Sequence, residues 1–187
     1  MRKILTLSIS LLFSGAACAQ RVQEQPATVP ETVIARAASA IVVDGQGNDD
    51  AWKKATKIPF IFPWNDVTRE TPQSTVARML YDDKALYLLY ECVDPYLHAE
   101  VTDKDGPVWE EDAVEIFVTP NPADITAYFG YEMNANGTFL DYMAFEGGEH
   151  STKSIQFAWE SEGVQLKTSW VGTLNDHSDV DKSWVLE

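Results

Sequence analysis

Cysteine and histidine are scarce in this chain of 187 residues, which has two cysteines and three histidines. Cys18 lies near the N-terminus and leaves Cys92 alone in an apolar segment, so no internal disulfide framework is expected. The sequence holds no C-x-x-C pair and no H-E-x-x-H motif. The sequence therefore gives no indication of zinc or thiol chemistry. Cys92 is predicted to be a small core residue, and the histidines are predicted to lie at the surface.

Basic residues are also few, with 14 lysines and arginines against 29 aspartates and glutamates and a formal net charge of −15 at pH 7. A protein with this excess of negative charge is repelled by phosphate backbones and by anionic lipid surfaces. We therefore expect no nucleic acid among its partners.

Long apolar runs are missing apart from one at the N-terminus, residues 4–13. Arg2 and Lys3 precede this run, and the small residues Ala17-Cys18-Ala19 follow it, which is the pattern of a secretory signal peptide over 1–19. The run is too short for a transmembrane span. The sequence thus predicts an exported protein that is periplasmic, at the cell surface or secreted, with a lipid anchor at Cys18 as an alternative.

The remaining chain divides into a linker or tether over 20–36, which contains Pro26 and Pro30, and a domain over 37–187. Short runs of aromatic and β-branched residues alternate there with turn sequences such as Asn136-Gly137. This pattern predicts an all-β fold, an antiparallel β-sandwich. The expected strands are 74–81, 86–93, 113–118, 127–134, 138–145, 154–159, 164–171 and 183 onward. Only 49–55 is expected to form a helical turn.

Residues 183–187 alternate in the manner of a strand, with Trp184 and Leu186 on one side. No turn follows them, so we expect that the domain as given lacks its last strands. The alternative is a short edge strand at this position.

The segment from Val108 to Pro120, VWEEDAVEIFVTP, combines four acidic residues with a tryptophan and β-forming residues. Alternation from Ala113 puts Val114, Ile116 and Val118 on one face of a strand and Glu115 on the other. A buried carboxylate needs a partner, so Glu115 is expected to face a cation, a ligand hydroxyl or a wet groove. Exposure on the solvent side of a two-faced strand explains it equally well.

Several motifs resemble, in order, those of family 9 carbohydrate-binding modules and their DOMON-like relatives. They are IVVDG at 41–45, DDAW at 49–52, ARMLYD at 77–82, LYL at 86–88, VD at 93–94, WEEDAVEIF at 109–117 and YEMNANG at 131–137. The resemblance implies a jelly-roll type sandwich that holds an oligo- or polysaccharide between tryptophans, with structural calcium.

Carried over residue by residue, the resemblance makes Trp109 a sugar-stacking residue and Glu115 an acceptor of sugar hydroxyls. An indole stacks on the C–H-rich face of a pyranose, and carboxylates make strong hydrogen bonds to hydroxyls. On the segment 127–134, Glu132 and Asn134 share a face and are expected to border the same groove. A basic residue can occupy the position of Glu132 in the family pattern, and a second stacking tryptophan comes from a region that we expect to be missing here. Trp52 and Trp170 are interpreted as core residues.

Calcium needs six to eight oxygen ligands, which acidic turns can supply. Asp44, Asp94 and Asp112 are the predicted ligands, although solvated turn carboxylates account for them as well. No EF-hand spacing is present.

The leading interpretation is an exported non-catalytic carbohydrate-binding domain that supports polysaccharide catabolism. One alternative is a domain associated with catalysis, in which case the enzyme is a glycoside hydrolase acting on O-glycosyl bonds; Glu110, Glu111 and Glu115 are its candidate carboxylates. A second alternative is a haem-binding DOMON-like redox domain, which needs a Met and a His facing one pocket. A third is a sandwich that only docks proteins.

Overall fold

The structure is a computed structural model that describes residues 31–60, 73–146 and 153–187. Apart from Glu31, these residues belong to one compact unit, Thr32–Glu187. The expected signal peptide over 1–19, its Cys18 and most of the expected linker lie outside the described residues. Strand β1 (Ala35–Arg36) pairs with a strand of the sandwich, so the folded unit begins within the segment interpreted as linker.

The described residues form two β-sheets. In the six-stranded sheet the strands β3, β4, β10 and β9 lie side by side in that order, and the short strands β1 and β2 both pair with β3. The bounds are β2 Ile58–Pro59, β3 Ser74–Tyr81, β4 Leu86–Val93, β9 Thr168–Val171 and β10 Ser183–Leu186. All of these pairings are antiparallel except β1 with β3, which is parallel.

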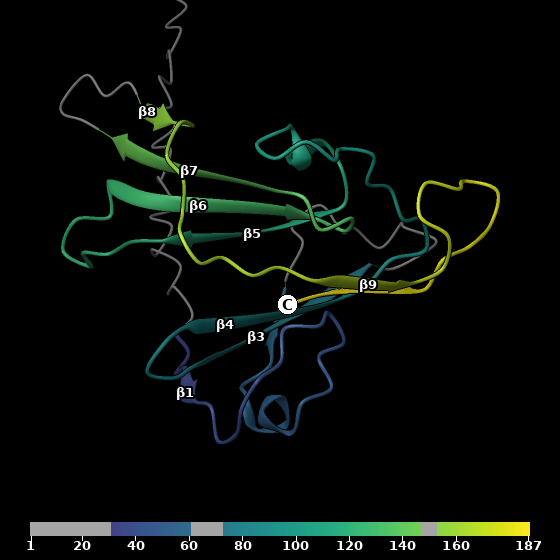
Figure 1. Ribbon diagram of the computed structural model, residues 1–187, viewed down its shortest axis with the longest axis horizontal. Coiled ribbons are helices and arrows are strands. Elements are labelled where there is room, and N and C mark those ends of the chain that lie inside the picture. The colour runs from purple at the N-terminus through teal and green to yellow at the C-terminus, as the bar shows by residue number, and fades with distance from the viewer. Residues whose placement is uncertain (1–30, 61–72, 147–152) are drawn as a thin grey trace, which may run out of the picture. The chain divides into compact units, whose positions relative to one another are not determined.

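The four-stranded sheet runs in the order β5-β6-β7-β8 and is antiparallel throughout. Its strands are β5 Ala113–Val118, β6 Ala127–Asn134, β7 Phe139–Glu146 and β8 Lys153–Gln156. Figure 1 shows β5, β6 and β7 as one layer and β3, β4 and β9 as the other. Two 3-10 helices, η1 (Asp50–Lys54) and η2 (Val108–Glu110), complete the regular structure of the described chain. The predicted all-β sandwich is therefore confirmed.

The core lies between the two sheets and follows the alternation of the strands. Tyr90 of β4 and Trp184 of β10 pack in one apolar cluster with Val114 of β5 and Met133 of β6. The Tyr90 hydroxyl also donates a hydrogen bond to the Glu115 carbonyl, at 3.2 Å. Because inward residues alternate with outward ones, the opposite face of β5 is left to present Glu115 away from this core.

Each sheet carries a second apolar cluster on its outer face. Trp52 of η1 packs with Leu80 and Leu89 against the six-stranded sheet, and Val108 of η2 packs with Leu140 against the four-stranded sheet. The interpretation of Trp52 as a core residue is confirmed, since it is 1% exposed. Cys92 is also buried.

Several expectations about the strands are wrong. Strand β9 begins at Thr168 rather than Val164, and Trp170 on it is 39% exposed rather than part of the core. Strand β10 is not an edge strand, because it pairs with β4 on one side and β9 on the other. The strand in the acidic segment begins at Ala113, as expected, and Trp109 lies before it on η2. Alternation alone does not reveal where a segment leaves a sheet.

Candidate functional site

Two glutamates face each other on the outer face of the four-stranded sheet. Glu115 of β5 and Glu132 of β6 are direct partners in the antiparallel register. Directly opposed residues have Cβ atoms about 4.5–5.5 Å apart, so the two side chains leave the sheet together. Glu115 is exposed, whereas Glu132 is only 9% exposed. One carboxylate therefore stands at the rim of this surface and the other lies at its base.

A shallow pocket of about 340 Å³ opens over these two glutamates. Trp109 lines it from η2 and is 50% exposed. Tyr142 of β7 and Phe157, which follows β8, line it as well. Leu140 and Ile155 complete the lining. The pocket thus combines an exposed indole, further aromatic and aliphatic surface and two carboxylates.

Aromatic rings continue from this pocket across the sheet. Phe117 of β5 contacts Tyr128 of β6. The ring centroid of Tyr128 lies 6.5 Å from that of Tyr142. Tyr142 in turn contacts Phe157, with ring centroids 5.7 Å apart. All of these contacts are T-shaped or tilted, as is usual for aromatic pairs. They form a continuous aromatic strip beside the carboxylates.

Gly130 makes room for one of these rings. A Cβ atom at this position would lie 2.4 Å from Cζ of Tyr142, so only glycine lets the tyrosine ring lie directly over β6. In this position the Tyr142 hydroxyl hydrogen-bonds to the Glu132 carboxylate. Burial and the Glu132 charge raise the pKa of Tyr142 above its ordinary value, so the phenol keeps its proton and remains a donor.

The loop that carries Trp109 is held by the two residues that follow Glu110. Glu111 Oε1 accepts hydrogen bonds from the backbone amides of Glu100 and Val101, at 2.6 and 2.8 Å. Its Oε2 accepts one from the Asn134 amide, at 3.0 Å. The Glu111 carboxylate is thereby committed to the loop, so the pairing of Glu110, Glu111 and Glu115 as catalytic acids receives no support from the geometry.

The structure brings three of the four predicted sugar-binding residues together and leaves one apart. Trp109, Glu115 and Glu132 line the same pocket. Asn134 is fully buried, and its side chain bonds to the Val101 carbonyl, to Glu111 and to the Thr138 amide. It does not line the pocket, and its contacts instead tie the loop before β5 to the turn after β6.

Of the three predicted metal ligands, Asp94 and Asp112 lie together and Asp44 lies apart from them. Asp44 accepts hydrogen bonds from the Gln46 backbone and side chain, as an acid in a turn does. Asp94 and Asp112 lie side by side and share a side-chain hydrogen bond. Burial, together with the neighbouring Asp94, raises the pKa of Asp112 to about 6. A shared proton or a bound cation would relieve the repulsion between these two carboxylates.

A different acidic cluster could hold a metal ion on geometric grounds. Carboxylate oxygens of Asp105, Asp141 and Glu160 lie within 4.8 Å of one another. The Lys104 ammonium stands among them, at 2.9 Å from Asp105, 2.8 Å from Asp141 and 2.7 Å from Glu160. This lysine supplies the positive charge that the cluster needs. Asp141 needs it most, because its carboxylate is fully buried.

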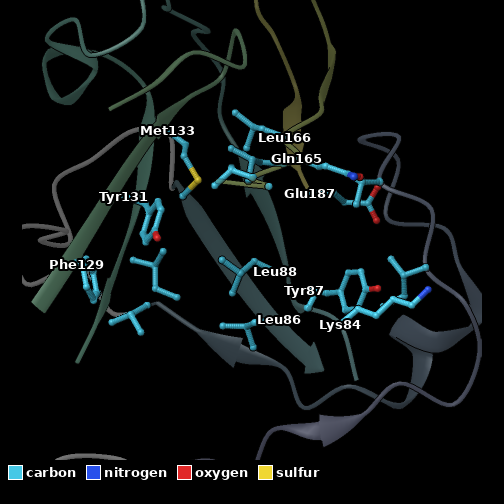
Figure 2. A pocket seen from close by; sticks show the side chains of 18 of the residues that line it. Lys84, Leu86, Tyr87, Leu88, Phe129, Tyr131, Met133, Gln165, Leu166 and Glu187 are labelled. Carbon is cyan, nitrogen blue, oxygen red and sulfur yellow. The ribbon is translucent and has the colours of Figure 1, made fainter. Parts of the chain in front are cut away.

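A larger cavity of about 630 Å³ opens between the two sheets. Figure 2 shows Leu86 and Leu88 on one side of it, with Phe129, Tyr131 and Met133 on the other. No histidine occurs among the described residues that line it, so the Met and His pair required by the redox alternative is not assembled there. Most of its lining is apolar, and Lys84, Glu162, Gln165 and Glu187 also line it.

The described residues form an all-β sandwich with a pocket on the outer face of its four-stranded sheet. Residues 43–169 match the family model described as carbohydrate family 9 binding domain-like, and the chain belongs to this family. The same assignment follows from the sequence resemblance stated above, which is confirmed.

Two curated proteins are similar to this chain in sequence. The chain is 34% identical over 143 residues to endo-1,4-beta-xylanase C of Paenibacillus barcinonensis, a match that covers 70% of this chain and 12% of the xylanase. It is 24% identical over 128 residues to an extracellular protein of Arthroderma benhamiae, covering 59% of this chain and 57% of that protein. The chain thus spans less than two thirds of either relative.

One solved structure shares the fold. It is the crystal structure of a Bacteroides uniformis protein described as carbohydrate-binding, with a TM-score of 0.56 and 20% sequence identity. The match covers 82% of this chain and 68% of the other. Among the described residues, no helix has the length and apolarity that a membrane crossing requires.

Sequence reasoning missed four residues that line the pocket, Leu140, Tyr142, Ile155 and Phe157. Tyr142 belongs to a strand that was predicted, and the register that sets its neighbours could not be read from the sequence. Phe157 follows directly after β8, where the predicted strand continued to Trp159. The aromatic residues of this strand, Phe139, Tyr142 and Phe145, are three positions apart, so simple alternation did not single out Tyr142.

Proposed function

We propose that this chain is an exported, non-catalytic carbohydrate-binding domain that supports polysaccharide catabolism by holding a saccharide on the outer face of its four-stranded sheet. Trp109 stacks on the sugar ring, and Glu115 and Glu132 accept hydrogen bonds from its hydroxyl groups. Asn134 contributes by holding the loop that carries Trp109. The observation that carries the proposal is the half-exposed indole of Trp109 beside two carboxylates in one pocket.

The chemistry of the pocket supports this role. Aromatic side chains offer a flat apolar surface to the C–H face of a pyranose at little entropic cost. A carboxylate accepts hydrogen bonds that are stronger than those of a neutral acceptor. An exposed tryptophan side chain is unfavourable on a protein surface. Trp109 lies where a bound ligand would cover its indole.

Export of the chain is part of the proposal. The signal-like sequence over 1–19 supports it, and so does the name of the fungal relative, which is an extracellular protein. A lipid anchor at Cys18 remains the alternative to release as a free protein. The xylanase relative supports a role next to polysaccharide-degrading enzymes.

Calcium is proposed as a structural ion at Asp94 and Asp112. The two carboxylates come from the end of β4 and the start of β5, and they provide oxygen ligands of the kind that calcium prefers. Backbone carbonyls and water would complete the coordination. Asp44 lies with Gln46 instead, so its assignment as a ligand has less support.

Calorimetric titration with oligosaccharides from plant cell walls, in the presence of calcium, tests the sugar site. Trp109→Ala should weaken binding by about 1–3 kcal/mol, by analogy with bases stacked on aromatic side chains. Trp170→Ala is the matched control, because Trp170 is also partly exposed but belongs to β9 of the other sheet. Equal affinity of the two variants, or unfolding of Trp109→Ala alone, would contradict the assignment of Trp109.

A further inference from the structure

The aromatic strip continues beyond the pocket on the side of β5. Phe117, which is 52% exposed, lies outside the lining of the pocket. It follows Glu115 by two residues on the same face of β5, about 7 Å further along the strand. In the register it lies opposite Gly130, the residue over which the Tyr142 ring lies. The exposed Phe117 ring is thus continuous with the part of the pocket that Tyr142 forms.

The strip crosses the four-stranded sheet from β5 to β8. Phe117, Tyr128 and Tyr142 lie on β5, β6 and β7, and Phe157 follows β8. Neighbouring strands lie about 4.8 Å apart, so the four positions span roughly 14 Å, which is longer than one pyranose ring. Phe157 at the β8 end is exposed, like Phe117 at the β5 end. Two accessible rings therefore flank the two tyrosines, which are less exposed.

The arrangement of these rings favours a chain of sugars over a single sugar. Exposed apolar side chains that adjoin one another mark a binding surface. A saccharide held only in the pocket, on Trp109 and Glu115, would leave the Phe117 ring in water. A glycan that lies across the strip covers Phe117 and Phe157 together, and the C–H faces of successive sugar rings fit the faces of aromatic side chains.

We propose that the site binds an internal segment of a linear glycan, at least about three sugar units long, that lies across the strip from Phe157 to Phe117. This rests on the proposed function, because it extends the same saccharide site and states which part of a polysaccharide it takes. Sugar rings stack on Phe157 and Phe117 in addition to Trp109, and the exposed Glu115 carboxylate accepts hydrogen bonds from their hydroxyl groups. Because the outer rings of the strip are both exposed, the glycan continues past each of them.

The test is calorimetric titration of the full chain with β-1,4-linked oligomers of glucose, xylose and mannose, from the dimer to the hexamer. In the series that binds, affinity should rise about 10-fold from the dimer to the tetramer, because each further ring stacked on an aromatic side chain adds to binding. It should then level off. Reduction of the terminal sugar of the hexamer to an open-chain alditol should leave the affinity unchanged, since an internal segment does not use the chain end.

Variants locate the additional stacking position. Phe117→Ala should weaken binding of the hexamer about 10-fold and so reduce the gain in affinity from short to long oligomers. Phe145→Ala is the matched control, because Phe145 is also an exposed phenylalanine of the four-stranded sheet. It lies three residues after Tyr142 on β7 and therefore on the opposite face. This control should leave the affinity for every oligomer unchanged, whereas Trp109→Ala should weaken binding of short and long oligomers alike.

The outcomes separate this inference from the proposed function. Equal affinity for the dimer and the hexamer, or loss of hexamer binding on reduction of its end, overturns the extended site and leaves the saccharide pocket at Trp109 standing. Equal affinity of Phe117→Ala and Phe145→Ala for the hexamer overturns it as well. Failure of every oligomer to bind overturns both proposals. If thermal unfolding shows that Phe117→Ala does not fold, the length series and the reduced hexamer, which need no variant, decide the case.

Discussion

At the scale of single residues, one carboxylate connects three distant parts of the chain. Glu187 Oε1 accepts a hydrogen bond from the Trp52 indole at 2.9 Å, and its Oε2 accepts bonds from the backbone amides of Asp44 and Gly45. Glu187 is buried, and so are its bonds from the Gly45 amide and the Trp52 indole, which would lose their acceptor if the side chain were removed. The turn at Asp44-Gly45 and the packing of η1 depend on this one side chain.

Glu187→Ala should lower the free energy of unfolding by about 3 kcal/mol, because it leaves these buried donors without an acceptor. Urea denaturation monitored by tryptophan fluorescence measures the effect. Glu110→Ala, which removes an exposed carboxylate, should cost far less. Similar losses for the two variants would show that the bonds of Glu187 contribute little.

Gly130→Ala tests the close approach of β6 to the Tyr142 ring. The new methyl group would collide with the ring, so we expect a loss of about 1–3 kcal/mol in stability and weaker saccharide binding as Tyr142 and Glu132 shift. In a Tyr142→Ala background the same substitution should cost almost nothing. A double-mutant cycle in urea denaturation measures this coupling, and purely additive effects would contradict it.

At the scale of elements, the loop before β5 positions the stacking tryptophan. Asp112 accepts a hydrogen bond from the His98 amide at 2.7 Å, and Glu111 accepts bonds from the Glu100 and Val101 amides. The three acids after Trp109 therefore differ in their surroundings, since Glu110 is exposed while Glu111 and Asp112 anchor backbone. The position of η2, and with it of the pocket wall, follows from these anchors.

Glu111→Gln should weaken saccharide binding and lower the melting temperature, because an amide nitrogen would then face either the Asn134 amide or the backbone donors. Glu110→Gln makes the same change in charge one residue earlier and should preserve both properties. Calorimetry and thermal unfolding of the two variants give the comparison. If Glu111→Gln retains full affinity, the anchoring of η2 does not determine the site.

At the scale of the whole molecule, Asp94 and Asp112 link the two sheets at the ends of β4 and β5. Without calcium, folded Asp112 keeps its proton up to a pKa of about 6, whereas an unfolded aspartate releases it near ~3.9. Between these values the folded state binds more protons than the unfolded state, so this pair makes stability fall as the pH rises.

Asp112→Asn should remove this contribution. In calcium-free buffer the variant should gain stability relative to the parent protein between pH 4 and about 6 and remain ahead at pH 7. Added calcium should raise the melting temperature of the parent protein at pH 7 but not that of the variant. Melting curves over this pH range, with EDTA or with calcium, provide the measurement. Parallel curves for the two proteins would rule out the coupling of Asp94 with Asp112.

Local pattern by itself determined most of the strands. Segments 74–81, 86–93, 113–118 and 127–134 were predicted with their observed bounds, because each is rich in β-forming residues and is bounded by turn sequences. The Asn136-Gly137 turn was also recognised, and Gly137 has the positive φ of 87° that such a turn requires. The face on which Glu115 lies followed from the same alternation.

Only the tertiary structure decided which distant residues meet. The register of β5 against β6 places Glu115 opposite Glu132, and a shift by one residue would have turned Glu132 to the core. Asn134 shares a face with Glu132 but lies under the loop that covers it, so its position along the strand could not reveal its burial. Pairing of β10 on both sides and the approach of Phe157 to Tyr142 also depend on contacts between segments far apart in sequence, which local alternation does not encode.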